Sequence, residues 1–396
     1  MNVLVANLGS TSFKYKLFCM DEEEQVLASG TADRIGQGAS HWAVDAAGRH
    51  LNGICDLSDH AAAIELHLQK MLELGAISGI EEVEAIGFKA VHGGPISGAV
   101  QVDDRVLSMM QRMVPLAPQH NPPYIEAMKS FRQKLPEVAQ VAAFETAFHT
   151  SIPLRRQVYA VPYDWIDRYG IRRYGFHGAS NAYIAARMAQ LEPNCPKLIN
   201  LHLGGSCSIC AIESGASVAH SMGASAQTGV FHANRVGDFD PFSLIALREQ
   251  GLGIDEALTQ LSVGGGLLGL SGISADLREI ETAASSGNTR AQLAIDAFIE
   301  SCRHYVCAYL GVLNGADAIV FTGGIGLNAH AIRSAILRNL DYAKIGIDPQ
   351  KNQDADPNQE TRIDTAASGV QIWIVPTNEE LVVARQTVQL LSKQAA

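Results

Sequence analysis

The sequence has little basic charge for its length. Its 396 residues include 30 Lys and Arg against 41 Asp and Glu, which gives a formal net charge of −11. It also lacks a long run of Lys and Arg, the usual sign of binding to nucleic acid or to an anionic membrane. We therefore expect no nucleic acid and no membrane among its partners, and small molecules instead.

Long uninterrupted hydrophobic runs are absent too. The most apolar long stretch, residues 258–275, is broken by five glycines, which indicates a loop rather than a membrane-spanning helix. The first residues, MNVLVANLGS, lack the basic start and the small-residue cleavage site of a signal peptide. These features predict a cytoplasmic protein.

Cysteine is scarce, with seven residues scattered through the chain. An odd number with this spacing argues against a secreted disulfide framework. Cys207 and Cys210 form one CxxC pair, but a zinc site needs further ligands and no second pair lies nearby. We favour buried, inert thiols over a metal site.

The composition is that of a globular protein, with 47% hydrophobic and 18% charged residues, and the length suits two domains of about 150 residues each. Predicted strands alternate with predicted helices, which indicates an α/β architecture. A pattern of strand, Gly/Ser turn and strand over residues 3–18 recurs over residues 197–212. Two similar halves that close on a nucleotide would produce this recurrence.

Apolar spacing and turn residues predict several other elements. They are a helix over 61–74, a buried strand over 85–91, a shaped Pro-rich loop over 115–123, a strand over 318–321 before a glycine turn at 322–326, a strand over 372–375 and a closing helix over 381–391.

Three glycine-rich turns follow predicted strands, at residues 7–12, 204–206 and 322–326. Such turns expose backbone N–H groups that can hold phosphates. None matches a P-loop or an intact dinucleotide-binding fingerprint. Each one alone is more often an ordinary tight turn, but the three together favour a nucleotide site.

Polar residues near these turns are candidates for chemistry. Asn7, Ser10, Ser12 and Lys14 offer one cation and three polar groups to a phosphate or its metal, although Lys14 alone could equally be a solvated surface residue. Glu145 stands in an otherwise apolar run, where an isolated carboxylate indicates a functional role.

Four histidines and one arginine also lie beside turns. The histidines, whose spacing is not that of metal ligands, are His92, His120, His149 and His177. A structural role is the simpler interpretation for each of them. Arg235 lies in a polar loop bounded by glycine, which suits either an arginine that reaches an anion or a plain salt bridge.

Nine ordered motifs give the whole chain a specific resemblance. They are NLGSTS from Asn7, VHGG from Val91, APQHNPP from Ala117, ETAFH from Glu145, YGFHG from Tyr174, HLG from His202, LNGAD from Leu313, FTGGIG from Phe321 and PTNEEL from Pro376. In these motifs the chain resembles the acetate kinase family, within the acetate and sugar kinase/heat-shock 70/actin superfamily.

The resemblance implies an α/β, two-domain ribonuclease-H-like fold, as in actin-like ATPases, with mixed sheets and an interdomain nucleotide cleft. Residues 1–149 plus 381–396 would form the N-terminal domain, and residues 150–380 the C-terminal domain with the nucleotide loops. The implied reaction is reversible, direct in-line transfer of the γ-phosphoryl group of ATP to a short-chain carboxylate such as acetate. Mg²⁺, or Mn²⁺ in its place, would be the cofactor, and a homodimer the assembly.

The resemblance also implies roles for individual residues. Catalytic roles fall on Glu145, His177 and Arg235, substrate binding on Lys89, Val91, Gln119 and Phe176, and metal binding on Asn7 and Glu379. Nucleotide binding falls on Ser10, Ser12, Lys14, His202, Leu203, Gly204, Gly205, Ser206, Asp276, Leu277, Arg278, Gly324, Ile325, Gly326, Leu327 and Asn328.

Two departures from the family concern charged residues. Lys89 stands where the family has arginine, and lysine loses the planar fork that binds a carboxylate or phosphoryl group through two hydrogen bonds. Glu145 stands where the family has aspartate, and its extra methylene displaces the carboxylate. We hypothesise that the two changes compensate each other.

Two further departures concern the acyl pocket, where Gln119 replaces a leucine and Ala226 a proline. A wider, more polar pocket would suit a larger or hydroxylated carboxylate, which is one alternative function. A family member that binds nucleotide without turnover is another. Because Lys89 and Glu145 keep their charges, we favour retained catalysis.

Overall fold

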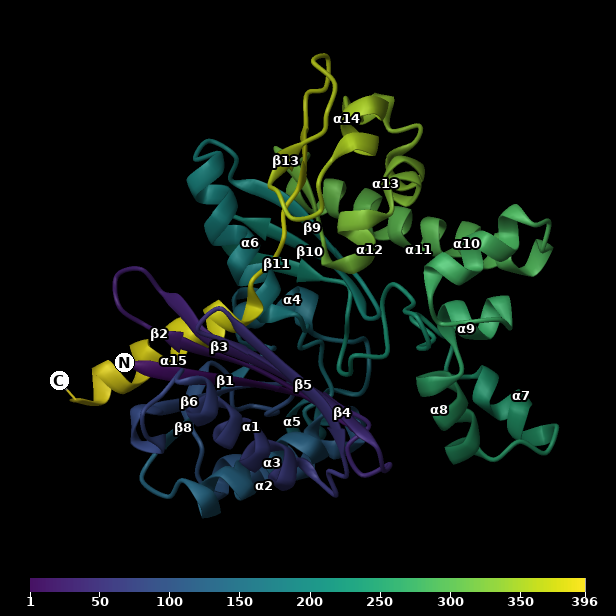
Figure 1. Cartoon of the computed structure of the whole chain (residues 1–396). Helices are drawn as coiled ribbons and strands as arrows, with labels where there is room; N and C mark the ends of the chain where they lie inside the picture. The colour runs from purple at the N-terminus through teal and green to yellow at the C-terminus, as the bar shows by residue number, and fades with distance from the viewer. Residues whose placement is uncertain (396) are drawn as a thin grey trace. The chain divides into compact units, whose positions relative to one another are not determined.

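The computed structural model describes residues 1–395, which form two compact units (Figure 1). The first unit contains residues 1–147 and the end of the chain from Asn378, and the second contains Phe148–Thr377. Each unit has its own mixed sheet and its own hydrophobic core.

The first unit holds an eight-stranded sheet in the order β5-β4-β3-β2-β1-β6-β8-β7. Its strands are β1 Asn2–Leu8, β2 Ser12–Cys19, β3 Gln25–Asp33, β4 Ser40–Ala46, β5 Arg49–Cys55, β6 Ala85–Ala90, β7 Ala99–Gln101 and β8 Ala139–Phe144. Strands β1 to β5 form an antiparallel meander, whereas β1, β6 and β8 are parallel. The carboxyl ends of these parallel strands therefore lie at the same end of the sheet, where polar side chains can gather.

Helices cover both faces of this sheet (Figure 1). They are α1 His60–Leu74, α2 Asp104–Arg112, α3 Asn121–Lys134 and α15 Glu379–Ala395. Helices α1 and α3 contribute to the main core, while Val383 and Ala384 of α15 pack against Val3 and Val5 on the opposite face. Helix α1 begins at the N-cap Asp59, whose carboxylate accepts a hydrogen bond from the N–H of Ala62.

The second unit holds a six-stranded sheet in the order β11-β10-β9-β12-β14-β13. Its strands are β9 Lys197–Leu203, β10 Cys207–Glu213, β11 Ala216–His220, β12 Ala318–Thr322, β13 Thr361–Arg362 and β14 Gln371–Ile374. Strands β11, β10 and β9 are antiparallel, and β9, β12 and β14 are parallel. This repeats the pattern of β3, β2, β1, β6 and β8, so the predicted recurrence of two similar halves is confirmed.

Helices also flank the second sheet, with α6 on one face and α11 on the other. The helices of this unit are α4 Leu154–Gln157, α5 Tyr163–Tyr169, α6 Gly178–Leu191, α7 Ser243–Glu249, α8 Ile254–Val263, α9 Gly266–Ser271, α10 Leu277–Ser285, α11 Thr289–Leu313, α12 Gly323–Asn328, α13 His330–Leu337 and α14 Pro349–Asp354. Alternating strands and helices around mixed sheets confirm the α/β class.

Three segments that the sequence predicts as loops are partly helical. The prediction was wrong there because glycine and proline also occur at helix ends. Residues 258–275 contain the end of α8 and all of α9, with glycines between and after them. The Pro-rich segment begins in a 3₁₀ helix, Val114–Leu116, and is a loop only over residues 117–120, since α3 carries the last two prolines in its first turn, where no N–H is needed. The glycine turn after β12 is the start of α12, where Gly323 has φ +77° and a Cβ would lie 2.6 Å from the carbonyl oxygen of Leu203.

All seven cysteines of the described chain are free thiols, of which Cys207, Cys210 and Cys302 are buried. Burial raises the pKa of Cys207 and of Cys210 to about 12, so both thiols stay protonated at neutral pH. The prediction of inert thiols is confirmed for these two. Within residues 1–395, no helix is both long and apolar enough to cross a membrane.

Candidate active site

Three adjacent strands of the first unit bring Lys14, Asn7 and Lys89 side by side. Asn7 of β1 pairs directly with Lys14 of β2, and the parallel pairing of Ala6 with Phe88 places Lys89 next to Asn7 on β6. Paired residues point to the same face of a sheet. This is the face that α15 covers, and the first turn of α15 reaches Lys89.

Lys89 forms an ion pair with Glu379 in the first turn of α15. The distance from Lys89 Nζ to Glu379 Oε2 is 2.5 Å, and the two side chains are 19% and 13% exposed. Glu145 follows β8, is 5% exposed, and lies close enough for its charge to act on Lys89. Burial alone would lower the pKa of Lys89, but the charges of Glu379 and Glu145 outweigh it, so the pKa lies well above its ordinary value. Lys89 is therefore a permanent cation between two carboxylates.

Tyr124 belongs to the same cluster and was missed in the sequence. Its hydroxyl accepts a hydrogen bond from the N–H of Leu8 and donates one to Asn7 Oδ1, both at 3.2 Å. Burial raises the pKa of Tyr124 to about 12, so it stays a neutral donor. The clue in the sequence was a tyrosine directly after a proline pair at a helix start, because a buried hydroxyl there needs a partner.

The predicted metal residues offer oxygen donors that suit Mg²⁺. Asn7 contributes a carboxamide oxygen and Glu379 a carboxylate, and Mg²⁺ is usually held by one or two protein oxygens together with water and substrate phosphates. Residues 1–395 contain no group of three or more His, Cys, Asp and Glu side chains arranged to hold a metal. The donor set at this edge of the sheet therefore fits a Mg²⁺ ion that binds together with a phosphate ligand.

The remaining predicted residues of the first unit lie near the same strand ends. Lys14 and Ser10 are exposed, and Ser12 is half-buried at the start of β2. Val91, directly after β6, packs against the edge of the main core, and Gln119 is half-buried in the Pro-rich loop. The unit thus gathers a cation, carboxylates and an apolar contact at one edge of its sheet.

In the second unit, His177 is held in an unusual backbone conformation. It precedes α6 with φ +55°, a left-handed conformation that is costly for a residue with a side chain. Its Nδ1 lies 2.8 Å from Ser208 Oγ, and its ring stacks on that of His202 with 4.2 Å between centroids. These contacts fix the orientation of the imidazole. Ser208, on β10, was not identified in the sequence.

Arg235 is a second fixed group of this unit and is only 6% exposed. Its Nη1 donates to the carbonyl oxygen of Ala226 at 2.7 Å, so this contact is a hydrogen bond to the backbone and not a salt bridge. Burial lowers the pKa of Arg235 to about 10, so the guanidinium is still charged at neutral pH. Gly266 allows α9 to approach this loop, because a Cβ there would lie 2.1 Å from the carbonyl oxygen of His232.

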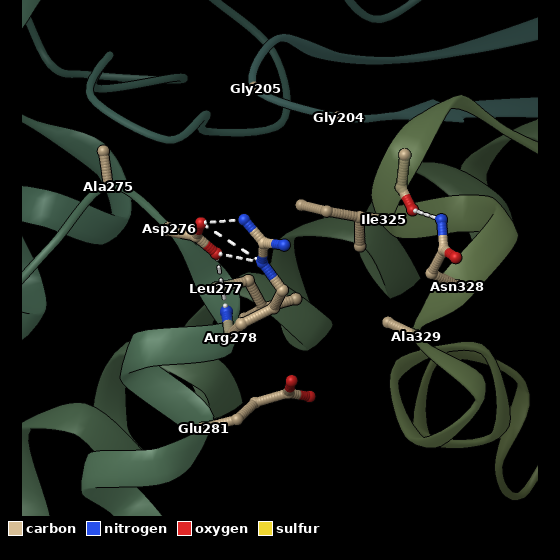
Figure 2. Close-up of a pocket in the computed structure, with 11 residues that line it drawn as sticks. Gly204, Gly205, Ala275, Asp276, Leu277, Arg278, Glu281, Ile325, Asn328 and Ala329 are labelled. Carbon is tan, nitrogen blue, oxygen red and sulfur yellow. Dashed lines mark hydrogen bonds and ion pairs between the residues drawn. The ribbon is translucent and has the colours of Figure 1, made fainter.

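A cavity of about 720 Å³ lies in the second unit between the β9–β10 turn, α10 and α12 (Figure 2). Its lining includes these predicted nucleotide residues: Gly204, Gly205, Asp276, Leu277, Arg278, Gly324, Ile325 and Asn328. A Cβ at Gly205 or Gly324 would meet nothing within 4 Å, so the backbone there is open to a ligand. Glu281 and Ala329 also line the cavity and were not identified in the sequence.

Arg278 is the cationic group of this cavity, and Figure 2 shows it held by Asp276. The guanidinium Nε lies 3.0 Å from Asp276 Oδ1, and the same oxygen caps α10 by accepting the N–H of Arg278. Arg278 lowers the pKa of Asp276 to about 2. On the opposite wall, Asn328 Nδ2 donates to the carbonyl oxygen of Gly324 at 2.8 Å.

The other predicted nucleotide residues support this cavity rather than line it. Leu203 is buried in the core, and Ser206 Oγ lies 3.4 Å from His232 Nδ1. The carbonyl oxygens of Gly326 and Leu327 accept hydrogen bonds from the buried Arg333. Phe176 is buried in the second unit and thus belongs to a different unit from Lys89, Val91 and Gln119.

Known proteins are similar to this chain over nearly its whole length. The sequence profile of the acetokinase family matches residues 2–385. The acetate kinase of Natranaerobius thermophilus is 41% identical over 99% of this chain and 100% of the relative, and that of Shouchella clausii is 40% identical over 98% and 99%.

Solved structures agree as well. The acetate kinase of Porphyromonas gingivalis has a TM-score of 0.88 at 35% identity, and a propionate kinase of Francisella tularensis has 0.91 at 34% identity. Each comparison covers 98% of this chain and 99% of the solved one. The fold is accordingly the actin-like, ribonuclease-H-like one predicted from the motifs, and the chain belongs to the acetokinase family.

Proposed function

We propose that this protein catalyses the reversible transfer of the γ-phosphoryl group from ATP to acetate. A carboxylate oxygen of acetate attacks the γ-phosphorus in line, the bond to the leaving ADP breaks, and acetyl phosphate forms. The observation that carries this proposal is the full-length similarity to acetate kinases, with 41% identity over 99% of the chain.

In the first unit, Lys89 would bind the anionic substrate. Its permanent charge suits this role, and Glu145 and Glu379 hold the ammonium in place. We assign Glu145 as the catalytic carboxylate, with Val91 and Gln119 as contacts to the acyl group. A Mg²⁺ ion held by Asn7 and Glu379 would neutralise charge on the nucleotide phosphates. Ser10, Ser12 and Lys14 would contact those phosphates.

In the second unit, His177 and Arg235 would stabilise the phosphoryl group during transfer. Such transfer depends on positioning and on positive charge around the equatorial oxygens. Ser208 and His202 orient the imidazole of His177, and the carbonyl of Ala226 orients the guanidinium of Arg235. The cavity of Figure 2 would hold the nucleotide, with Arg278 at its wall. Phe176 would contact the acyl group.

We further propose a homodimer in the cytoplasm. Free thiols suit a reducing compartment. Large apolar side chains are exposed at and within α7 and α8, including the N-cap Phe242 at 74% and Leu258 at 48%, which suits burial against a second copy. We also retain residues 1–149 with 381–396, and residues 150–380, as the two functional domains.

The relatives named above are acetate kinases and a propionate kinase, and none is named for a hydroxylated acid. We therefore prefer acetate over a larger or hydroxylated acceptor. Retained charged residues at positions 89 and 145, close enough to act on each other, favour turnover over a role in binding alone.

The test is formation of acyl phosphate from ATP and Mg²⁺, trapped as hydroxamate, with acetate, propionate, glycolate, lactate and glycerate. Acetate should give the highest kcat/KM. Lys89→Met should abolish activity, whereas the matched Lys16→Met should not, since Lys16 pairs with the neighbouring Glu380. Preference for a hydroxy acid would assign specificity to Gln119 and Ala226. ADP binding without turnover on any acid would contradict the proposal.

A further inference from the structure

The cluster in the first unit contains one buried group that the proposed chemistry has not used, the hydroxyl of Tyr124. Tyr124 is 1% exposed and lies in the first turn of α3. That turn is anchored by Asn121, whose Nδ2 donates to the carbonyl oxygens of His92 and Met110 at 2.9 and 2.8 Å. Two hydrogen bonds of Asn121 therefore anchor the turn that carries Tyr124.

The hydrogen bonds of Tyr124 determine which way its proton points. A phenol has one proton and can accept as well as donate. The N–H of Leu8 donates to the Tyr124 oxygen, so the hydroxyl proton is directed to its other partner, Asn7 Oδ1. An N–H group cannot accept that proton, so the bond distinguishes the oxygen of the Asn7 carboxamide from its nitrogen.

This distinction matters because the two ends of a carboxamide are nearly identical in shape but opposite in function. The oxygen can bind Mg²⁺, whereas the NH₂ group only donates hydrogen bonds and repels a cation. Without an orienting donor, the amide of Asn7 could turn its NH₂ group toward the cation.

We propose that Tyr124 is a positioning residue for the divalent cation: its hydroxyl fixes the Asn7 carboxamide in the orientation that can bind Mg²⁺. This inference rests on the proposed metal-binding role of Asn7. Tyr124 acts through Asn7 and not on the reacting atoms. Partners that orient metal ligands typically change metal affinity by 10- to 100-fold.

The chain offers a matched control for the loss of a buried phenol. Tyr15 lies on β2, is 3% exposed, and its hydroxyl has no hydrogen-bond partner within the described residues. Tyr15→Phe therefore removes the same atom from the same unit without removing a hydrogen bond. It should leave metal binding unchanged.

The experiment measures binding of Mn²⁺ to the full-length protein by electron paramagnetic resonance with ADP present, and binding of metal-free ADP by calorimetry. Tyr124→Phe should weaken Mn²⁺ binding by about 10-fold and leave the affinity for metal-free ADP unchanged. In activity assays, the Mg²⁺ concentration for half-maximal rate should rise while the KM for acetate stays constant. Near-UV circular dichroism checks that the variant is folded.

An Asn7→Asp background separates orientation from general packing. Aspartate presents an oxygen in both orientations, so it needs no orienting donor. Adding Tyr124→Phe to Asn7→Asp should therefore change Mn²⁺ affinity by less than about twofold. An equal loss in both backgrounds would show that Tyr124 acts by packing and would overturn the inference.

Asn7→Ala separates the inference from the proposed site. If Asn7→Ala weakens Mn²⁺ binding and Tyr124→Phe does not, the inference fails while the metal site stands. If Asn7→Ala leaves Mn²⁺ binding unchanged, the metal site is wrong and the inference fails with it. Losses in both variants, with rescue in the Asn7→Asp background, would support both.

Discussion

At the scale of single residues, the central feature of the candidate site is the trio of Lys89, Glu145 and Glu379. Lys89 is paired with Glu379, and the charge of Glu145 also acts on it. An anionic substrate that approaches Lys89 must compete with these carboxylates, so the spacing of the charges decides how strongly it binds. This makes the lengths of the side chains at 89 and 145 interdependent.

We predict that Lys89→Arg and Glu145→Asp are coupled. Each single change should lower kcat/KM for acetate by about 10-fold, because a misplacement of about 1 Å strongly lowers the rate in such a site. The double variant should recover most of this loss, which corresponds to a coupling energy of about 2 kcal/mol. Steady-state kinetics on the four proteins measures it.

The control for this double-mutant cycle combines Lys89→Arg with Lys16→Arg. Lys16 is suited to it because its ion pair is with Glu380. That pair should be additive. Strict additivity of the Lys89 and Glu145 changes would argue against compensation between them.

At the scale of elements, α12 depends on a buried arginine. Arg333 of α13 is 1% exposed, and its Nη1 donates to the carbonyl oxygens of Gly326 and Leu327 at 2.9 and 2.8 Å. Its Nε and Nη2 bind Asn352 of α14. Burial lowers the pKa of Arg333 to about 10, which still leaves it charged at neutral pH. One side chain thus connects three helices beside the cavity.

We predict that Arg333→Met destabilises the fold by about 3 kcal/mol, because it leaves buried carbonyl groups without donors. It should also weaken ADP binding by about tenfold, which corresponds to roughly 1.4 kcal/mol, since α12 lines the cavity. Urea unfolding and calorimetric titration of ADP measure the two effects.

The matched control is Arg303→Met. Arg303 donates to the carbonyl oxygens of Ala335 and Ile336, near the C-terminal end of α13, whereas Arg333 donates to α12. It should lose stability and keep its ADP affinity. Equal loss of ADP binding in both variants would mean that Arg333 has no specific role in holding α12.

At the scale of the whole molecule, stability depends on histidines that the core keeps neutral. His67 is 1% exposed, packs edge-on against Phe13 and Tyr15, and neither ring nitrogen has a hydrogen-bond partner within residues 1–395. Burial lowers its pKa from 6.5 to about 4. Between these two values the unfolded chain binds a proton that the folded chain does not, so this contribution to stability falls as the pH falls.

We predict that His67 makes the free energy of unfolding about 2 kcal/mol smaller at pH 5 than at pH 7. His67→Leu should remove this share of the pH dependence, as measured by urea unfolding at the two pH values. Phe13→Leu, which disturbs the same cluster without a titrating group, should destabilise the protein equally at both. An unchanged pH dependence in His67→Leu would show that His67 is protonated in the folded state.

Much of the architecture could be predicted because it is written in local patterns. The β1–β2 hairpin, α1, β9 to β10 and β12 follow from hydrophobic spacing and turn residues, and these elements are confirmed. The boundaries of α3, α9 and α12 could not be predicted, because glycine and proline look the same in a loop and at a helix end.

The motifs by themselves determined the family and the α/β fold, and they predict the reacting groups, since all of these depend on residue type and order. Only the tertiary structure decided which partner each side chain contacts. Glu379 pairs with Lys89, Tyr124 donates to Asn7, and Ser208 contacts His177. Arg333 likewise donates to a backbone carbonyl of α12. The first three of these contacts join residues 31 or more positions apart, and the fourth joins two neighbouring helices. Their physical reason is burial, because a polar group removed from water must find its hydrogen bonds within the fold, and the packing of elements sets which partner is in reach.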